Sequence, residues 1–142
     1  MTRFTKIGAT GAELPPDATE WVAVLDRRTG RMWAVKPIKV TNWREAQVKK
    51  TETKISRLAL AGYTDWRIPT VEELFILADR TRRDPAIDVD FFPDCPSDWF
   101  WTSTPYAPSP GDCAWFVLFF NGGALYFDRD VSGFVRAVRG GQ

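Results

Sequence analysis

The sequence predicts an α+β domain in which two helices brace a small twisted antiparallel sheet with long irregular loops. Three observations support this class. Residues 70–80 carry a capped amphipathic helix pattern, residues 114–127 contain two short strands around an Asn-Gly turn, and residues 84–98 are rich in proline and aspartate. The 142 residues include seven Trp and ten Phe, which provide enough apolar volume for one core.

The chain is expected to divide near residue 20. Glycines and a Pro-Pro pair lie among small polar residues before that point, a composition typical of a connecting segment. We therefore expect an N-terminal arm or linker over 1–19 and a single domain over 20–142.

The domain is expected to open with a β-hairpin. Residues 21–26 alternate as a strand, residues 27–30 supply a turn, and residues 32–35 form the returning strand. This arrangement directs Trp21 and Trp33 toward the core.

Two helices are predicted next. The first spans 41–60, where a Thr-Asn pair supplies the cap of an incomplete apolar face. Pro69 keeps the preceding residues 65–68 extended, and the second helix then spans about 71–80. Thr70 and Glu73 have the spacing of a capping box, which fixes where this helix begins.

The segment 84–98 is predicted to be a long structured loop. Its five aspartates suggest a calcium site, because hard cations are bound by several oxygen ligands. The spacing is not that of an EF-hand, however, so we expect no metal and no cofactor. The aspartates are Asp84, Asp88, Asp90, Asp94 and Asp98.

The last third carries the clearest strand pattern. Residues 99–106 form a strand with Trp99 and Trp101 on one face, and residues 114–120 form a strand with apolar side chains on both faces. A strand with one face in water alternates with polar residues, so either both faces of 114–120 are covered or one face meets a partner. The strand 124–127 follows the Asn-Gly turn.

The segment FVRAVR, residues 134–139, is expected to close the sheet. Val135 and Val138 point inward in this interpretation. Arg136 and Arg139 are expected to pair with acidic side chains.

The amino-acid composition argues against common enzyme mechanisms. The chain has no histidine, which is the commonest general base and metal ligand. Cys95 and Cys113 lack CxxC spacing and a histidine partner, so neither a zinc site nor a Cys-His nucleophile can be formed. These cysteines either form a disulfide across the Pro-rich loop or remain two reduced thiols. We expect a protein that is not an enzyme.

The charge balance argues against polyanion binding. Nineteen basic and eighteen acidic residues give a net charge of +1, so we expect neither nucleic acid nor a membrane as partner. The N-terminus lacks an apolar core of signal-peptide length. The protein is therefore expected to be cytoplasmic as synthesised, and display on a virion or cell surface is an alternative without support in the sequence.

Four motifs together resemble one known family. They are TGRMW, GYTDWRIPT, WTST and VRAVR, which occur in the same order between Trp21 and Arg139. In this respect the chain is similar to the C-terminal domain family of the Legionella collagen-like protein. The resemblance implies a C-type-lectin-like fold and a ligand-binding role, and it includes the variable proteins diversified by retroelements.

The resemblance also indicates which residues face the ligand. In relatives, the residues interleaved between the core positions of the C-terminal strands are the exposed ones. We add Tyr106, which lies at the end of the strand before them. With Tyr106 included, the predicted ligand-binding residues are Tyr106, Phe116, Leu118, Phe120, Asn121, Tyr126, Asp128 and Asp130.

The predicted function is therefore that of a noncatalytic recognition domain with an aromatic and polar surface on its C-terminal sheet. Apolar anchors of this kind favour a protein partner over a glycan, and a homo-oligomer is an alternative use of the same apolar face. Two other interpretations remain. One is a fold-related enzyme of the formylglycine-generating type that uses Cys95 and Cys113, and the other is an oligomerising structural or phage-associated adaptor protein.

Overall fold

A computed structural model describes residues 3–40, 55 and 58–141 of the chain. Most of the first predicted helix, 41–60, lies outside these residues. Its last residue belongs to a short 3-10 turn, η1 (Leu60–Gly62).

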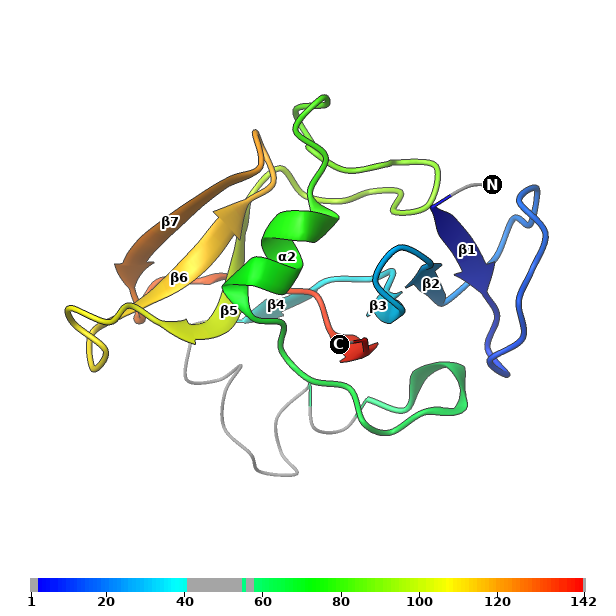
Figure 1. The fold of residues 1–142 in the computed structure, drawn as a ribbon, viewed down its shortest axis with the longest axis horizontal. Helices are drawn as coiled ribbons and strands as arrows, with labels where there is room; N and C mark the ends of the chain where they lie inside the picture. Colours follow the sequence, from blue (N-terminus) through cyan, green and yellow to red (C-terminus); the bar gives the residue numbers. More distant parts are fainter. Residues whose placement is uncertain (1–2, 41–54, 56–57, 142) are drawn as a thin grey trace.

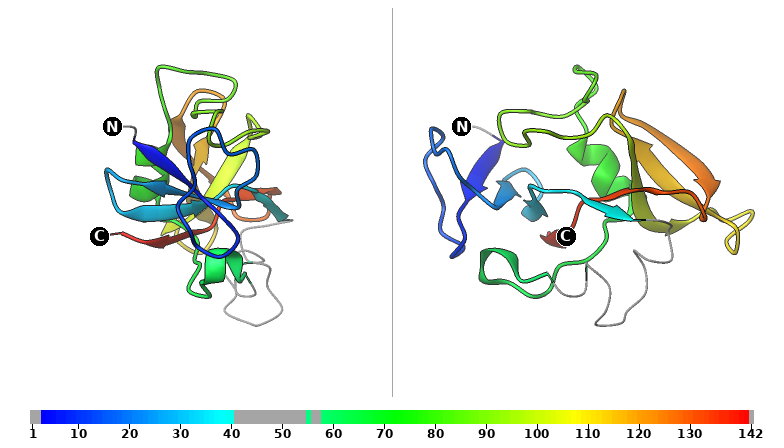
Figure 2. Two further views of the ribbon diagram at one scale, coloured as in Figure 1. Left: turned by 90° about the vertical axis from the view of Figure 1, so that its right-hand side faces the viewer. Right: turned by 180° about the vertical axis from the view of Figure 1, so that it is seen from behind.

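The described residues form two β-sheets and one short helix, so the predicted fold is wrong. We predicted a C-type-lectin-like α+β fold with two helices bracing one sheet, and the described part of the chain is mostly β. The error arose because the N-terminal hairpin and the C-terminal strands were assigned to one sheet. They belong to two sheets that lie side by side along the long axis of the molecule (Figure 1; Figure 2).

The first sheet is antiparallel throughout and has the order β1-β2-β3-β9. The predicted hairpin is confirmed as β2 and β3, and β1 lies within the segment predicted to be an arm. The strand pattern of these four residues was not recognised because the segment around them is rich in Gly and Pro. The strands are β1 (Phe4–Ile7), β2 (Ala23–Asp26), β3 (Arg31–Ala34) and β9 (Val138–Gly140).

The second sheet has the order β4-β8-β5-β6-β7, so β7 is an edge strand. β5 and β8 pair in parallel through Phe100 and Phe134, and the other pairs are antiparallel. The predicted hairpin around Asn121-Gly122 joins β6 to β7, as Figure 1 shows in orange. The strands are β4 (Ile38–Val40), β5 (Trp99–Pro105), β6 (Cys113–Leu118), β7 (Gly123–Asp128) and β8 (Gly133–Val135).

The core consists of two apolar clusters, and neighbouring residues of one strand alternate between them. In β3, Met32 belongs to one cluster and Trp33 to the other. Because side chains alternate across a strand, the two clusters cover opposite faces of the sheets. In β6, Phe116 and Val117 divide in the same way, and both are buried.

The helix α2 (Val71–Leu77) begins at the predicted capping box. Thr70 Oγ1 accepts a hydrogen bond from the Glu73 amide, and the Glu73 carboxylate accepts one from the Thr70 amide. The helix ends earlier than predicted because Ala78 has extended backbone angles. It packs against β5, β6 and β7.

The Glu73 carboxylate also ties this helix to the first sheet. Its oxygens lie 2.7 and 2.8 Å from the Arg67 guanidinium and 3.2 Å from Arg31 Nε in β3. Burial alone would raise the pKa of Glu73, but the hydrogen bonds from Arg67 and Thr70 and the two positive charges hold it below its ordinary value. Arg67 further donates to the Gly140 carbonyl in β9.

The segment FVRAVR crosses between the sheets. Val135 in β8 and Val138 in β9 are buried as predicted, and Arg139 pairs with Asp65 at 2.7 Å. The prediction for Arg136 is wrong, because its fully buried guanidinium donates to the carbonyls of Ala34 and Val35. A position between two sheets offers backbone acceptors that a sequence pattern does not reveal.

Candidate functional site

Three consecutive apolar side chains are exposed on the edge strand β7. Leu125, Tyr126 and Phe127 are 51%, 48% and 46% exposed, respectively. Successive side chains point to opposite faces of a strand, so this segment presents apolar groups on both faces of the sheet edge. With Tyr106 and Trp115, which contact Tyr126, these residues form a surface that we call the aromatic edge.

On one face, three rings form a compact cluster. Tyr106 and Tyr126 stack with their centroids 3.7 Å apart and their planes 9° from parallel. Trp115 packs edge-on against both, with centroids 5.7 Å away in each case. Hydrogen bonding to Tyr126 is the main reason that the pKa of the Tyr106 hydroxyl is raised, so Tyr106 is uncharged at neutral pH.

On the other face, the rings extend from the core to the surface. Trp99 stacks on Phe116 with centroids 4.5 Å apart, and Phe127 meets Trp99 edge-on at 4.8 Å. Trp101 packs edge-on with Phe116, with the ring centroids 5.7 Å apart. Phe127 is therefore held in place by an internal ring stack although almost half of its surface is exposed.

The structure separates the predicted ligand residues into three groups. Phe116 is only 2% exposed, enclosed by two tryptophans, and Leu118 is half-buried against the same cluster. Phe120 and Asn121 lie at the turn that joins β6 to β7. There Asn121 Oδ1 accepts a hydrogen bond from the Gly123 amide.

The third group lies at the opposite end of the hairpin. Tyr106 and Tyr126 meet there, and Asp128 follows at the end of β7. Asp128 accepts a hydrogen bond from the amide of Asp130, and both aspartates are exposed. Because six extended residues of β7 span about 20 Å, these residues and Asn121 do not form one compact site.

The sequence interpretation missed three residues of the aromatic edge. Trp115, Leu125 and Phe127 were not included among the predicted ligand residues. The apolar run in β7 is visible in the sequence, but its exposure depends on β7 being last in the sheet order. The two-sided apolar pattern of 114–120 is explained by burial, since Phe116 and Val117 lie in opposite clusters.

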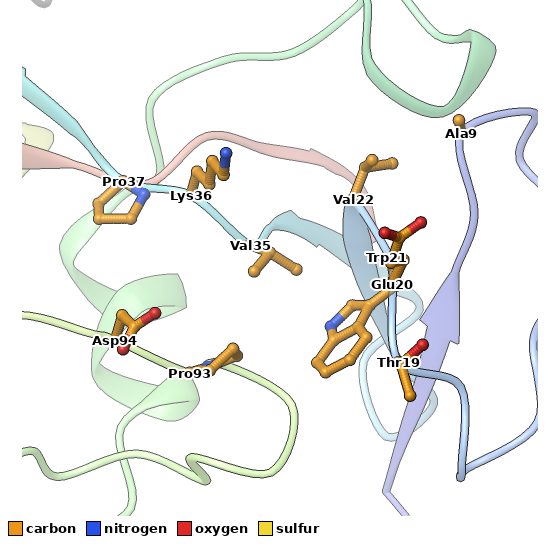
Figure 3. Close-up of a pocket in the computed structure, with 10 residues that line it drawn as sticks. All are labelled: Ala9, Thr19, Glu20, Trp21, Val22, Val35, Lys36, Pro37, Pro93 and Asp94. Carbon is orange, nitrogen blue, oxygen red and sulfur yellow. The ribbon is translucent and has the colours of Figure 1, made fainter.

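A separate hollow of about 600 Å³ lies beside the first sheet (Figure 3). Trp21 forms one side and Pro93, from the Pro- and Asp-rich loop, lies across from it. Residues 35–37, which lead from β3 to β4, contribute Val35, Lys36 and Pro37. Ala9, Thr19, Glu20, Val22 and Asp94 complete the lining.

The two cysteines are free thiols in the structure. Cys95 is buried, and its Sγ lies 3.3 Å from a guanidinium nitrogen of Arg136. Burial raises the pKa of this thiol, and the positive charge of Arg136 offsets only part of the effect. Cys95 is therefore a neutral packing residue at neutral pH rather than a thiolate nucleophile.

The described part of the chain has no group of three or more Asp, Glu, Cys or His side chains placed to hold a metal ion. Among the same residues, no helix is both long and apolar enough to span a bilayer.

Comparison with known families agrees with the sequence motifs. The family model for the Lcl C-terminal domain matches residues 22–139, which include both sheets except β1 and the end of β9. No curated protein matches the sequence. The match confirms the resemblance carried by the four motifs and covers most of the chain, and the protein therefore belongs to the Lcl C-terminal domain family.

Proposed function

We propose that this domain is a noncatalytic recognition module that binds a protein partner through the aromatic edge. The observation that carries the proposal is the exposure of Leu125, Tyr126 and Phe127 on an edge strand. Monomeric proteins rarely leave contiguous apolar side chains in water, and such patches mark interaction sites. The absence of histidine from the sequence supports binding rather than acid-base chemistry.

The chemistry of the edge favours a protein partner over a glycan. Aromatic side chains dominate the energetic centres of protein interfaces, and each buried apolar anchor contributes about 1.5–3 kcal/mol. The Tyr106–Tyr126 stack and the Trp99–Phe127 contact hold these rings before binding, which lowers the entropy lost on association. A preorganised apolar surface is suited to a protein.

The backbone of β7 provides a second element of recognition. One side of β7 pairs with β6, and within the described residues no strand pairs with the other side. The outward row of amide and carbonyl groups can accept an extended segment of the partner as a further strand. Asp128 and Asp130 at the end of the edge then supply a polar rim that favours basic partner residues.

The proposal is tested with peptides selected from a displayed random library on the immobilised domain. Leu125→Ser should weaken the selected peptides by at least about tenfold, since it removes one apolar anchor of about 1.5 kcal/mol or more. Val89→Ser is the matched control, because Val89 is 42% exposed but lies in the Pro- and Asp-rich loop. Equal losses in the two variants would contradict the proposal.

Self-association is the competing use of the same surface. Light scattering of the wild type distinguishes the two, since a monomer leaves the edge available to another protein. A stable oligomer that Leu125→Ser dissociates without unfolding would assign the aromatic edge to contacts between copies of this chain. That result would overturn the proposal.

A further inference from the structure

We propose that the partner strand beside β7 inserts an apolar side chain into a groove between α2 and β7 and places an acidic side chain against Arg80. This role of the groove rests on the proposed function, because it requires an extended segment bound at β7. The groove, here called the helix groove, has a volume of about 290 Å³. Its lining residues are Val71, Glu72, Phe75, Ile76 and Ala124.

α2 packs beside β7 and runs in the opposite direction (Figure 1). At the start of the helix, the Val71 amide donates a hydrogen bond of 3.0 Å to Thr104 Oγ1 in β5. Thr104 directly precedes the register row that ends at Phe127, near the end of β7. After the helix, a Cβ on Gly122, just before β7, would lie 3.6 Å from Ala78 Cβ. The end of the helix is therefore next to the start of β7.

The side chains of β7 alternate between two faces of the sheet. Ala124 packs against the apolar cluster that contains the buried side chains of α2, so Ala124 and Tyr126 point to the helix side. Leu125 and Phe127 point to the opposite side. Side chains of a strand added beside β7 alternate in the same way, because residues opposite each other across a sheet share a face. Every second side chain of the partner therefore lies on the helix side, next to Ala124 or Tyr126.

The walls of the helix groove are apolar and partly open to solvent. Phe75 and Ile76 are 41% and 39% exposed on the helix, and Ala124 forms the β7 side. The volume is small for a separate ligand and suits one large apolar side chain. A helix of the partner would leave the outward amide and carbonyl groups of β7 without backbone partners, whereas an extended segment pairs with them. The groove thus fits a side chain of an added strand.

Arg80 lies at the end of the helix groove where β7 begins. Its Cζ is 3.3 Å from the centroid of the Phe75 ring, and a Cβ on Gly122 would lie 2.9 Å from its Cγ. Partial burial lowers the pKa of Arg80, and no carboxylate among the described residues raises it. The side chain is exposed, so its guanidinium can donate to a carboxylate of the partner.

The two ends of β7 carry opposite charges. Arg80 lies at the start of the strand, Asp128 lies at its end, and Asp130 follows. Complementary charges on a partner favour one orientation along β7, because the reversed orientation brings like charges together. The expected segment is extended, with apolar side chains at alternate positions, an acidic residue next to the turn and a basic residue at the far end.

Selection from a displayed random peptide library on the immobilised domain supplies the probe, and the tightest selected peptide is synthesised. Apolar residues should recur at every second position of the selected peptides, with an acidic residue at one end of the apolar run. Recurrence at every third or fourth position would indicate a bound helix and would overturn the proposal. If no peptide is selected, this proposal and the proposed function are both overturned.

Two variants connect the peptide to the helix groove, with affinity measured by calorimetry. Ile76→Gln makes one wall polar and keeps a residue that suits a helix, and it should weaken the peptide at least about fivefold. Arg80→Gln should weaken the peptide about threefold, and replacing the acidic residue of the peptide by its amide should then have no further effect. Arg83→Gln is the matched control, because Arg83 is exposed and lies over the Phe120 ring but does not line the groove.

Leu125→Ser distinguishes this proposal from the proposed function, since Leu125 lies on the opposite face of β7. The expected result is weakening by Leu125→Ser, Ile76→Gln and Arg80→Gln and unchanged affinity in Arg83→Gln. Weakening by Leu125→Ser alone would overturn the role of the groove and leave the proposed function in place. Weakening by none of the variants would overturn both. Equal losses in Arg80→Gln and Arg83→Gln would contradict the pairing with Arg80.

Discussion

β6 and β7 are paired over six positions, yet the side chains of β6 are buried or partly buried and those of β7 are mostly exposed to solvent. Phe116 and Val117 in β6 are almost completely buried, whereas the residues opposite them in β7 are more exposed to solvent. Leu125, opposite Phe116, is half exposed, and Ala124, opposite Val117, is partly buried. Both strands are apolar, so composition alone does not decide which one can meet a partner.

The difference follows from position in the sheet. β6 has a strand on each side, α2 against one face and the Trp99–Trp101 cluster against the other. β7 has only one neighbouring strand among the described residues. An apolar inner strand is thus part of the core, and an apolar edge strand is a surface that the fold leaves available.

The largest expected effect comes from β6. Phe116→Ala should lower the free energy of unfolding by about 3–5 kcal/mol, because it removes a buried ring and leaves a cavity between two tryptophans. Urea denaturation followed by tryptophan fluorescence measures this loss. Phe127→Ala is the matched change on β7 and should cost about 1 kcal/mol, mainly through its contact with Trp99. Similar losses in the two variants would show that the contrast between the strands is wrong.

The second effect concerns the helix that covers β6. Glu73→Gln should destabilise the domain by about 2 kcal/mol, since it removes the negative charge that lies 3.2 Å from Arg31 Nε and 2.7 Å from the Arg67 guanidinium. The pKa of Glu73 in the folded state lies below its ordinary value of 4.5. Its stabilising contribution is therefore present above that value and is lost as the pH falls through the folded-state pKa.

Denaturation measured from pH 7 down to about pH 3 tests whether the stabilising contribution of Glu73 is lost as the pH falls. The wild type should lose stability more steeply than Glu73→Gln in the acidic part of the range, so that the two curves converge. Parallel curves would contradict the role of Glu73. Glu72→Gln serves as the control, because Glu72 lies on the same helix but is exposed.

Local elements could be predicted from the sequence where a short-range signal decides them. The capping box at Thr70, the hairpin of β2 and β3, and the turn at Asn121-Gly122 are all confirmed. Sheet membership could not be predicted, because it depends on pairing between distant segments. The two strands that flank Arg136 belong to different sheets, and nothing in the FVRAVR pattern indicates that division.

The candidate surface shows the same limit. The resemblance indicated Tyr126 and Asp128, which are exposed, but it also indicated Phe116, which is enclosed. The alternation of side chains along a strand predicts which residues share a face, but it does not predict which face is covered by the rest of the protein. Only the sheet order shows that the exposed apolar side chains lie on the edge strand β7 and not on β6.

A smaller effect is expected at the turn that joins the two strands. Gly122 has φ of +83°, and a Cβ there would lie 2.9 Å from Arg80 Cγ. Gly122→Ala should therefore cost about 1–2 kcal/mol through backbone strain and displacement of Arg80. Gly111→Ala is the control, since no atom lies within 4 Å of its added Cβ, and it should leave the unfolding midpoint nearly unchanged. Equal shifts in the two variants would contradict the strain at Gly122.

The smallest effect on stability is expected where the effect on binding is largest. Leu125→Thr keeps a side chain that suits a strand and removes an apolar group that is half in water, so the free energy of unfolding should change by less than about 0.5 kcal/mol. The same variant should weaken peptides bound at the aromatic edge by about tenfold. A large loss of stability would mean that Leu125 belongs to the core in solution. Since the contrast between β6 and β7 rests on exposure, that result would remove the reason for assigning recognition to the edge.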